Sequence, residues 1–424
     1  MKTAAPDTAL SAAPGPTRSW ATSHLARLSE PDLTALLDLM PAWYHQRTWE
    51  IPKRCNPRRV WQYIDRHGLG GVMGALQLAG QVTGPVRLEA AQARYFSNML
   101  YFEQARQCCR HIQKKARAKD IPLVFVKGAV LAEEAYQDGG VRAFSDIDVI
   151  VPSRYAGTRL AAALGARIFG DGLAAGVVAR VRDPACFKMI VAGWEIELRY
   201  PMPGQQDPLY ALINGLDFGA RQTTASGLDV PELEWHIAFL VQHMAIQHFF
   251  SRFVWFLDLA ALFRAAAACI DMPKLKSVLA RQKMLNQMAA VSWFCRHYID
   301  PQFPRFDPVP RSWNHAFVTH MVKARTIAQG RFNKRHETIR GLIFTFLFSI
   351  AHLFLLTDPP TEGPPWRGTA GQGISRRLCA ALSMDHRLVE RLLAPAVRMG
   401  LLPAIWLLAR VFNLSIPSNE DGVP

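Results

Sequence analysis

The sequence has few cysteines and no long apolar run. Seven cysteines are spread over 424 residues, and none form a Cys-x-x-Cys pair. This pattern is typical of free thiols in a reducing compartment, so it predicts a cytoplasmic protein and disfavours thiolate zinc ligation. The most apolar stretch, residues 341–356, is shorter than the ~20 residues that a membrane-spanning helix needs. A buried helix is therefore predicted there, with an interfacial helix as the alternative.

Acidic residues are scarce relative to basic ones. Asp and Glu number 34 against 49 Lys and Arg, which gives a formal net charge of +15. A basic surface suits a nucleotide, a polyanion such as RNA or an anionic membrane surface, and it does not choose among them. Residues 1–20 are rich in Ala, Pro, Ser and Thr and hold no apolar block of signal-peptide length. We expect a disordered tail there.

Two aspartates stand one residue apart at the head of an apolar run. Asp146 and Asp148 precede the apolar residues 149–151, a pattern that predicts a buried β-strand. Residues i and i+2 of a strand point to the same face, so the two carboxylates should lie side by side. Like charges so placed cost stability, and a divalent cation between them would remove that cost. Hard oxygen ligands favour Mg²⁺ or Mn²⁺; a pair of strand-end aspartates that face solvent is the alternative.

A second apolar strand is predicted upstream, at residues 121–126. It ends in Lys127-Gly128, and a helical pattern follows over residues 129–136. Glycine at this position lets backbone N–H groups approach an anion at the start of the helix. The predicted order is therefore strand, glycine turn, helix, and a strand that carries the aspartates.

This order resembles the DNA polymerase β-like nucleotidyltransferase superfamily and, more closely, a family of uncharacterised bacterial nucleotidyltransferases. Ala129 departs from the superfamily, which usually has Gly-Ser or Gly-Gly at the turn, so a serine hydroxyl is missing there and Lys127 is the substitute charge. The residues that carry the resemblance are, in order, Lys127-Gly128, Tyr136, Arg142, Ser145 and Asp146-Ile147-Asp148.

A β-hairpin is predicted over residues 186–191 and 194–200, around a turn at Ala192-Gly193. The resembling family has an acid, Leu and His in the second strand, and Glu197-Leu198-Arg199 matches with Glu for Asp and Arg for His. The resemblance therefore implies Glu197 as the third carboxylate. Glu195 shares its face of the strand and is the runner-up, while a solvent-facing hairpin strand is the structural alternative.

Long helical patterns dominate from residue 231 onward, and His243, His248 and Asp258 resemble the helical part of the same family. The histidines are five residues apart rather than four, which does not fit a zinc-binding helix pair. We expect them to anchor Asp258 or to line the nucleotide cleft. Basic residues also crowd the end of the long helix predicted over residues 86–119. The helix dipole explains part of that cluster, and a phosphate or partner patch is the alternative for the rest.

Together these patterns predict an α+β protein: a polymerase β-like nucleotidyltransferase mixed sheet with helices, plus a large all-helical C-terminal region. The expected parts are a disordered tail (residues 1–24), a helical lead-in (25–84), the nucleotidyltransferase core (85–228), a helical domain (229–412) and a second disordered tail (413–424).

The resemblance implies an enzyme that moves a nucleoside monophosphate from an NTP such as ATP to a hydroxyl acceptor, which would be a saccharide, a protein or RNA. Asp146, Asp148 and Glu197 would be catalytic and would hold Mg²⁺ or Mn²⁺. Lys127, Gly128, Arg142 and Ser145 would bind the nucleotide.

Two other functions stay open at this point. Ala129 and the Glu-for-Asp change favour a degenerate member that binds nucleotide as a scaffold or regulator. The basic charge allows a peripheral-membrane or RNA-binding helical protein in which the aspartate strand is only structural. The expected location is cytoplasmic, with peripheral contact to an anionic membrane surface as the alternative.

Overall fold

The computed structural model describes most of the chain between residues 28 and 308. The predictions for both tails, for residues 341–356 and for most of the chain beyond residue 308 lie outside the described residues. The described residues are 28–84, 89–169, 186–201, 212–248 and 250–308, together with 322, 323 and 327.

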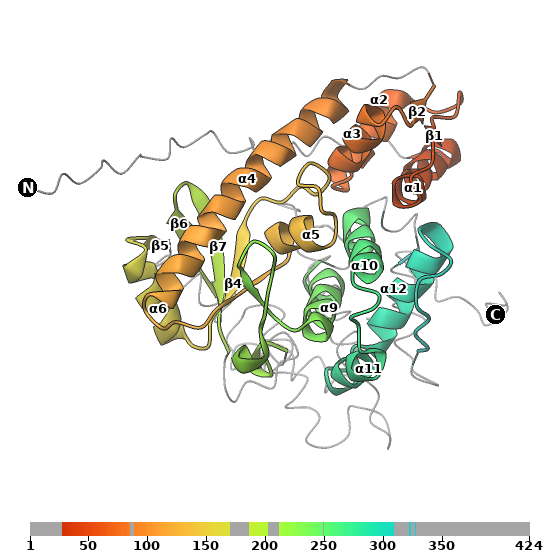
Figure 1. Ribbon diagram of the computed structural model, residues 1–424. Helices are drawn as coiled ribbons and strands as arrows, with labels where there is room; N and C mark the ends of the chain where they lie inside the picture. Colours follow the sequence, from red (N-terminus) through yellow and green to blue (C-terminus); the bar gives the residue numbers. More distant parts are fainter. Residues whose placement is uncertain are drawn as a thin grey trace, which may run out of the picture.

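A five-stranded mixed sheet lies beside α4, with most of the helices on its other side (Figure 1), and it confirms the prediction of an α+β protein with a mixed sheet. The strand order is β3-β4-β7-β6-β5. β4 pairs antiparallel with β3 and parallel with β7, so the strand that carries Asp148 is interior to the sheet. The strands are β3 (Val124–Val126), β4 (Ile147–Ile150), β5 (Arg167–Phe169), β6 (Cys186–Val191) and β7 (Trp194–Arg199).

The hairpin of β6 and β7 has the predicted turn. Ala192 and Gly193 both have positive φ, at 49° and 84°, as a two-residue hairpin turn requires. The register places Val191 opposite Trp194, and it continues without a slip to Cys186 opposite Arg199. The turn therefore decides which side chains of the two strands face one another.

The long helix α4 (Glu89–Arg117) runs diagonally across the sheet in Figure 1. Apolar residues three or four positions apart, among them Ala105, Cys109, Ile112 and Ala116, form a stripe that packs on the sheet. The shorter helices α5 (Gly128–Glu134) and α6 (Arg154–Ala163) complete this core cluster. The sequence predicted α4 and α5 to within a few residues at each end.

The remaining helices form a second, larger core. Residues from both ends of the described chain share it, for example Leu36 and Met40 with Phe256 and Phe294. Figure 1 shows these helices gathered on one side of the sheet. They are α1 (Glu30–Tyr44), α2 (Pro57–Arg66), α3 (Gly70–Leu78), α9 (Leu233–Gln242), α10 (Phe253–Ala265), α11 (Met272–Arg281) and α12 (Leu285–Tyr298). The predicted domain boundaries stay a prediction.

Several elements differ from the sequence prediction. The first helix of the region predicted to be helical from residue 231 onward is α-helical only to Gln242 and continues as a π-helix, η2 (His243–Gln247). Two small pairings were not predicted, because two-residue strands carry no periodicity. The small pairings are parallel β1 (Trp49–Glu50) with β2 (Val82–Thr83), and antiparallel β8 (Gln222–Thr223) with β9 (Asp229–Val230), preceded by the 3-10 turn η1 (Phe218–Ala220).

Among the described residues, no helix combines the length and the apolarity that crossing a membrane requires.

Candidate active site

Three carboxylates meet at the start of β4. Asp146 directly precedes the strand, Asp148 lies on it, and Glu197 is the register partner of Asp148 on the parallel strand β7. One carboxylate oxygen of each residue lies within 4.8 Å of those of the other two. Parallel register thus brings the third acid beside the pair. Glu195, the runner-up, instead forms an ion pair with Lys188.

Cations compensate this cluster of negative charge. Lys127 Nζ lies 2.5 Å from Asp148 Oδ1, and Arg199 forms an ion pair with Glu197. Lys188 Nζ is 3.9 Å from Glu197 Oε2. Asp148 and Glu197 therefore each have a basic partner, which offsets part of the repulsion among the three carboxylates.

The two strand acids differ in their electrostatic surroundings. Burial raises the pKa of Asp148, and the neighbouring carboxylates of Asp146 and Glu197 raise it further, while Lys127 opposes them. Burial also raises the pKa of Glu197, but Arg199, Lys127 and Lys188 together hold it below its usual value. Asp148 is thus the acid whose charge is least tolerated by its surroundings.

The donor set fits a hard divalent cation. Three carboxylates at this separation offer only oxygen ligands, which Mg²⁺ and Mn²⁺ prefer. In the described parts of the chain, no other group of three His, Cys, Asp or Glu side chains comes together in this way. The ring centroids of His243 and His248 lie 4.4 Å apart, and the ring of Trp255 lies beside them.

Lys127 stands at the junction of β3 and α5 in an unusual backbone conformation, with φ 61° and ψ −132°. Such positive φ is costly for a residue with a side chain. Its peptide N–H donates to His236 Nε2 at 3.3 Å, and its ammonium group lies 5.8 Å from the ring centre of Phe239. Two residues of α9 therefore hold Lys127 where its side chain reaches Asp148.

Gly128 is required by close packing. A Cβ atom at this position would lie 2.6 Å from the Cβ of Phe144, closer than real side chains approach. Phe144 leads directly into Ser145 and Asp146, and Ser145 Oγ donates to Asp146 Oδ1 at 3.2 Å. The glycine therefore lets the segment before the acids pack against the start of α5.

Arg142 forms its buried ion pair with Asp258 and not with one of the three site carboxylates. Its Nε and a terminal nitrogen donate to the two oxygens of Asp258 at 2.6 and 2.8 Å. Tyr136 donates to the same carboxylate at 2.7 Å. The structure thus places Lys127 against Asp148 and Ser145 against Asp146. Gly128 packs against Phe144, and Arg142 pairs with Asp258 of α10. The oxygens of Asp258, for which the sequence suggested histidine partners, are bound by Arg142 and Tyr136.

Two residues near the site were not singled out from the sequence. Lys188 lies opposite Glu197 in the hairpin register, and the turn at residues 192–193 already implied that pairing. His236 had no such signal, because its contact with Lys127 joins residues 109 positions apart. Burial lowers the pKa of His236 to about 4, so the ring is neutral and accepts the Lys127 N–H.

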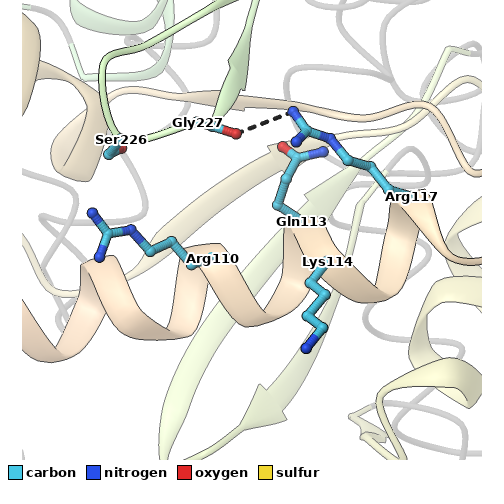
Figure 2. Close-up of a pocket in the computed structure, with 6 residues that line it drawn as sticks. All are labelled: Arg110, Gln113, Lys114, Arg117, Ser226 and Gly227. Carbon is cyan, nitrogen blue, oxygen red and sulfur yellow. Dashed lines mark hydrogen bonds between the residues drawn. The ribbon is translucent and has the colours of Figure 1, made fainter.

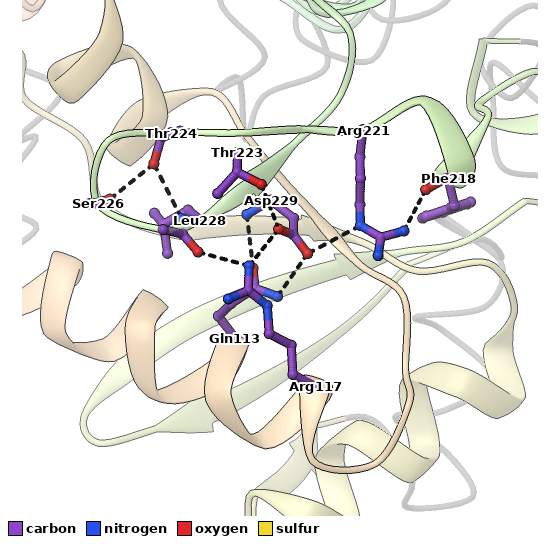
Figure 3. A network of polar contacts seen from close by, with 10 residues as sticks. Gln113, Arg117, Phe218, Arg221, Thr223, Thr224, Ser226, Leu228 and Asp229 are labelled. Atoms are coloured by element: carbon purple, nitrogen blue, oxygen red, sulfur yellow. Dashed lines mark hydrogen bonds and ion pairs between the residues drawn. The ribbon is translucent and has the colours of Figure 1, made fainter.

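A second polar region lies at the basic end of α4, where a cavity of about 300 Å³ opens beside the β8–β9 turn (Figure 2). Arg117 donates there to the carbonyl oxygen of Gly227 and to Asp229. Gln113 and Arg221 bind the same carboxylate (Figure 3). Part of the basic cluster at this helix end therefore fastens the β8–β9 hairpin to α4.

Comparison with curated proteins and solved structures gives only weak likenesses. No curated protein matches the sequence. A solution structure of the antibiotic-resistance factor ANT(2'')-Ia is 14% identical, with 46% of this chain and 98% of that chain covered and a TM-score of 0.31. A crystal structure of ANT(2'')-Ia in complex with adenylyl-2''-tobramycin is 14% identical, with 42% and 97% covered and a TM-score of 0.30. At these TM-scores neither likeness bears on the assignment.

The comparison with family models does support a family assignment. A family model described as an uncharacterised nucleotidyltransferase matches residues 54–300, more than half of the 424 residues. The match includes all three carboxylates, Lys127 and the helices α4, α9 and α10 that contact the segments around them. It confirms the family that the motif around Asp146 and Asp148 resembled. The chain belongs to the uncharacterised nucleotidyltransferase family.

Proposed function

We propose that this protein transfers a nucleoside monophosphate from an NTP to a hydroxyl acceptor. The observation that supports this most is the carboxylate group of Asp146, Asp148 and Glu197, held within 4.8 Å by strand register in a chain of a nucleotidyltransferase family. In the reaction, the acceptor hydroxyl loses its proton to solvent and its oxygen bonds to the α-phosphorus. The bond from that phosphorus to the bridging oxygen breaks, and pyrophosphate leaves.

The three carboxylates are the residues that would hold Mg²⁺ or Mn²⁺. Such ions, when bound, lower the pKa of an acceptor hydroxyl and stabilise the charge of the leaving pyrophosphate. Glu197 is suited to remain ionised, because its three basic neighbours hold its pKa low. Asp148 is suited to gain from a bound cation, because burial and its acidic neighbours raise its pKa.

Lys127 is the cation best placed to meet the phosphates of the nucleotide. Its side chain is 10% exposed and already lies against Asp148. A cation beside the carboxylates can move between them and an incoming phosphate, since it is drawn to both. Ser145, beside Asp146, offers a hydroxyl to the same region. The acceptor remains within the classes suggested by the sequence: a saccharide, a protein or RNA.

Thermal unfolding with Mg²⁺ and ATP tests the proposal. A ligand that binds only the native state stabilises it, by about 2.7 kcal/mol at a hundredfold excess over its Kd. We expect Mg²⁺ to raise the Tm of the wild type and ATP to raise it further. Asp148→Ala should stay folded and lose both shifts, because its substitution removes the central oxygen ligand.

Pyrophosphate release from ATP then separates turnover from binding alone. Pyrophosphate release by the wild type, but not by Asp148→Ala, would support nucleotidyl transfer. Binding without release, with acceptors of all three classes present, would instead assign a nucleotide-binding scaffold. Identical Tm shifts in the two proteins would place the ligands elsewhere and overturn the proposed site.

A further inference from the structure

The segment that leads to Asp146 contains no helix or strand. We call residues 138–146 the acid loop. Asp148 and Glu197 lie on paired strands, whose ladder hydrogen bonds fix their positions. Asp146 precedes the strand, so the position of its carboxylate depends on how the acid loop is held. Backbone groups outside regular structure need partners from elsewhere in the fold.

Helix α4 holds the acid loop from one side. Tyr95 donates to Asp138 at 3.0 Å, and the Asn98 amide donates to the carbonyl oxygen of Gly140 at 3.0 Å. Tyr101 donates to the carbonyl oxygen of Ser145 at 3.3 Å. Three positions along one helix make these contacts, which restrain the two ends of the acid loop.

Helix α10 holds the middle of the loop through one carboxylate. Asp258 is 2% exposed and Arg142 is 8% exposed, so their two-point ion pair is buried. Arg142 also donates to the carbonyl oxygen of Ala143, the next residue of the loop. The planar guanidinium therefore ties the loop backbone to α10 with a fixed direction, which a hydrophobic contact would not supply.

From these contacts we infer that Asp258 is a positioning residue for the carboxylate group. It touches none of the three acids, and it acts through Arg142 on the acid loop, and thereby on the place of Asp146 relative to Asp148 and Glu197. The consequence for metal binding and turnover rests on the proposed function. The inference adds that the helical part of the chain, through α10, shapes the site that lies on the sheet.

The test compares two aspartates that are buried to a similar degree. Asp258→Asn removes the charge that holds Arg142. Asp229→Asn makes the same chemical change in the ion-pair network that joins α4 to the β8–β9 hairpin (Figure 3), remote from Asp146 in its contacts. Arg142→Lys is the milder second variant, because it keeps the charge and loses the two-point geometry.

Two measurements are made on each full-length variant: Mn²⁺ affinity, from the electron paramagnetic resonance signal of free Mn²⁺, and amide hydrogen exchange over residues 138–146. Residues that orient metal ligands typically change metal affinity by about tenfold or more. We expect Asp258→Asn and Arg142→Lys to weaken Mn²⁺ binding by about tenfold and to speed exchange in the acid loop. Asp229→Asn should lower the Tm and leave both quantities unchanged.

Each outcome tests either the positioning role of Asp258 or the proposed metal site. Wild-type Mn²⁺ affinity in both folded Asp258→Asn and Arg142→Lys would overturn the positioning role, and so would equal weakening in Asp229→Asn. If Asp258→Asn does not fold, Arg142→Lys gives the answer. A wild type that binds Mn²⁺ no better than Asp148→Asn would overturn the proposed metal site instead. Hydrogen exchange over residues 138–146 would then still show whether Asp258 holds the acid loop.

Discussion

At the scale of single residues, Lys127 links three features of the site. Its backbone adopts a costly positive φ, its N–H is held by His236, and its ammonium group pairs with Asp148. The attraction of Asp148 and Glu197 keeps its pKa raised even though burial acts to lower it. The strain at this residue is therefore maintained by contacts that set the charge balance of the carboxylates.

Lys127→Met should destabilise the protein in the absence of metal. The substitution leaves Asp148 buried beside two other carboxylates without its nearest cation. Removal of one partner of a buried pair typically costs about 3–5 kcal/mol. Urea denaturation at neutral pH, followed by circular dichroism, measures the change in free energy of unfolding.

The matched control for this prediction is Asp148→Asn in the Lys127→Met background. It removes the uncompensated charge, so most of the lost stability should return. The interaction between the two substitutions in a double-mutant cycle is the quantity of interest. A double variant that is less stable than Lys127→Met alone would contradict the prediction.

At the scale of elements, strands and helices with clear periodicity were predictable from the sequence. The hairpin turn at Ala192-Gly193 set the register that brings Lys188 opposite Glu197. The contact of Arg142 with Asp258 was not predictable, because it joins positions 116 residues apart and either side chain alone is an ordinary polar residue. The π-helical end of α9 was missed for a related reason, since helix periodicity does not distinguish an α-turn from a π-turn.

The junction of β3 and α5 offers a prediction at this scale. Gly128→Ala places a methyl group 2.6 Å from the Cβ of Phe144, so the acid loop must shift or α5 must move. Overpacking of this kind costs about 1–3 kcal/mol. We expect lower stability in chemical denaturation, together with weaker Mn²⁺ binding, because Phe144 lies two residues before Asp146.

Ala132→Gly in the same helix is the control. It removes a buried methyl group and lowers helix propensity by about 1 kcal/mol, without adding an atom beside Phe144. It should lower stability and leave Mn²⁺ affinity unchanged. Equal loss of affinity in both variants would mean that α5 as a whole, and not the contact with Phe144, governs the acids.

At the scale of the whole molecule, the sheet and the helical part meet at the site. The sheet supplies the carboxylates, while α9 supplies His236 and α10 supplies Asp258. The family match over residues 54–300 includes both parts. The sequence predicted helical residues at the nucleotide cleft, with His243 and His248 as the candidates, but it did not point to His236 or to the pairing of Asp258 with Arg142. Both depend on contacts between buried polar residues, which hydrophobic patterning does not encode.

The buried neutral state of His236 predicts a contribution to the acid sensitivity of the whole fold. Its pKa falls from an ordinary value of 6.5 to about 4 on folding, because burial disfavours the charged ring. Above pH 6.5 the ring is neutral in both states and contributes nothing to the pH dependence. Between these values the unfolded chain binds a proton that the native protein does not, so stability falls as the pH falls.

His236→Gln should flatten this dependence. The glutamine carbonyl can still accept the Lys127 N–H, and it does not titrate. Through His236 the wild type loses stability that reaches about 3 kcal/mol near pH 4, at about 1.36 kcal/mol per pKa unit. The variant should not show this loss. Urea denaturation of both proteins at several values between pH 7.5 and 4 gives the difference in free energy of unfolding. Carboxylates common to both proteins cancel in that difference. Parallel curves would show that His236 is protonated in the native state, and Lys127 would then need another acceptor for its N–H.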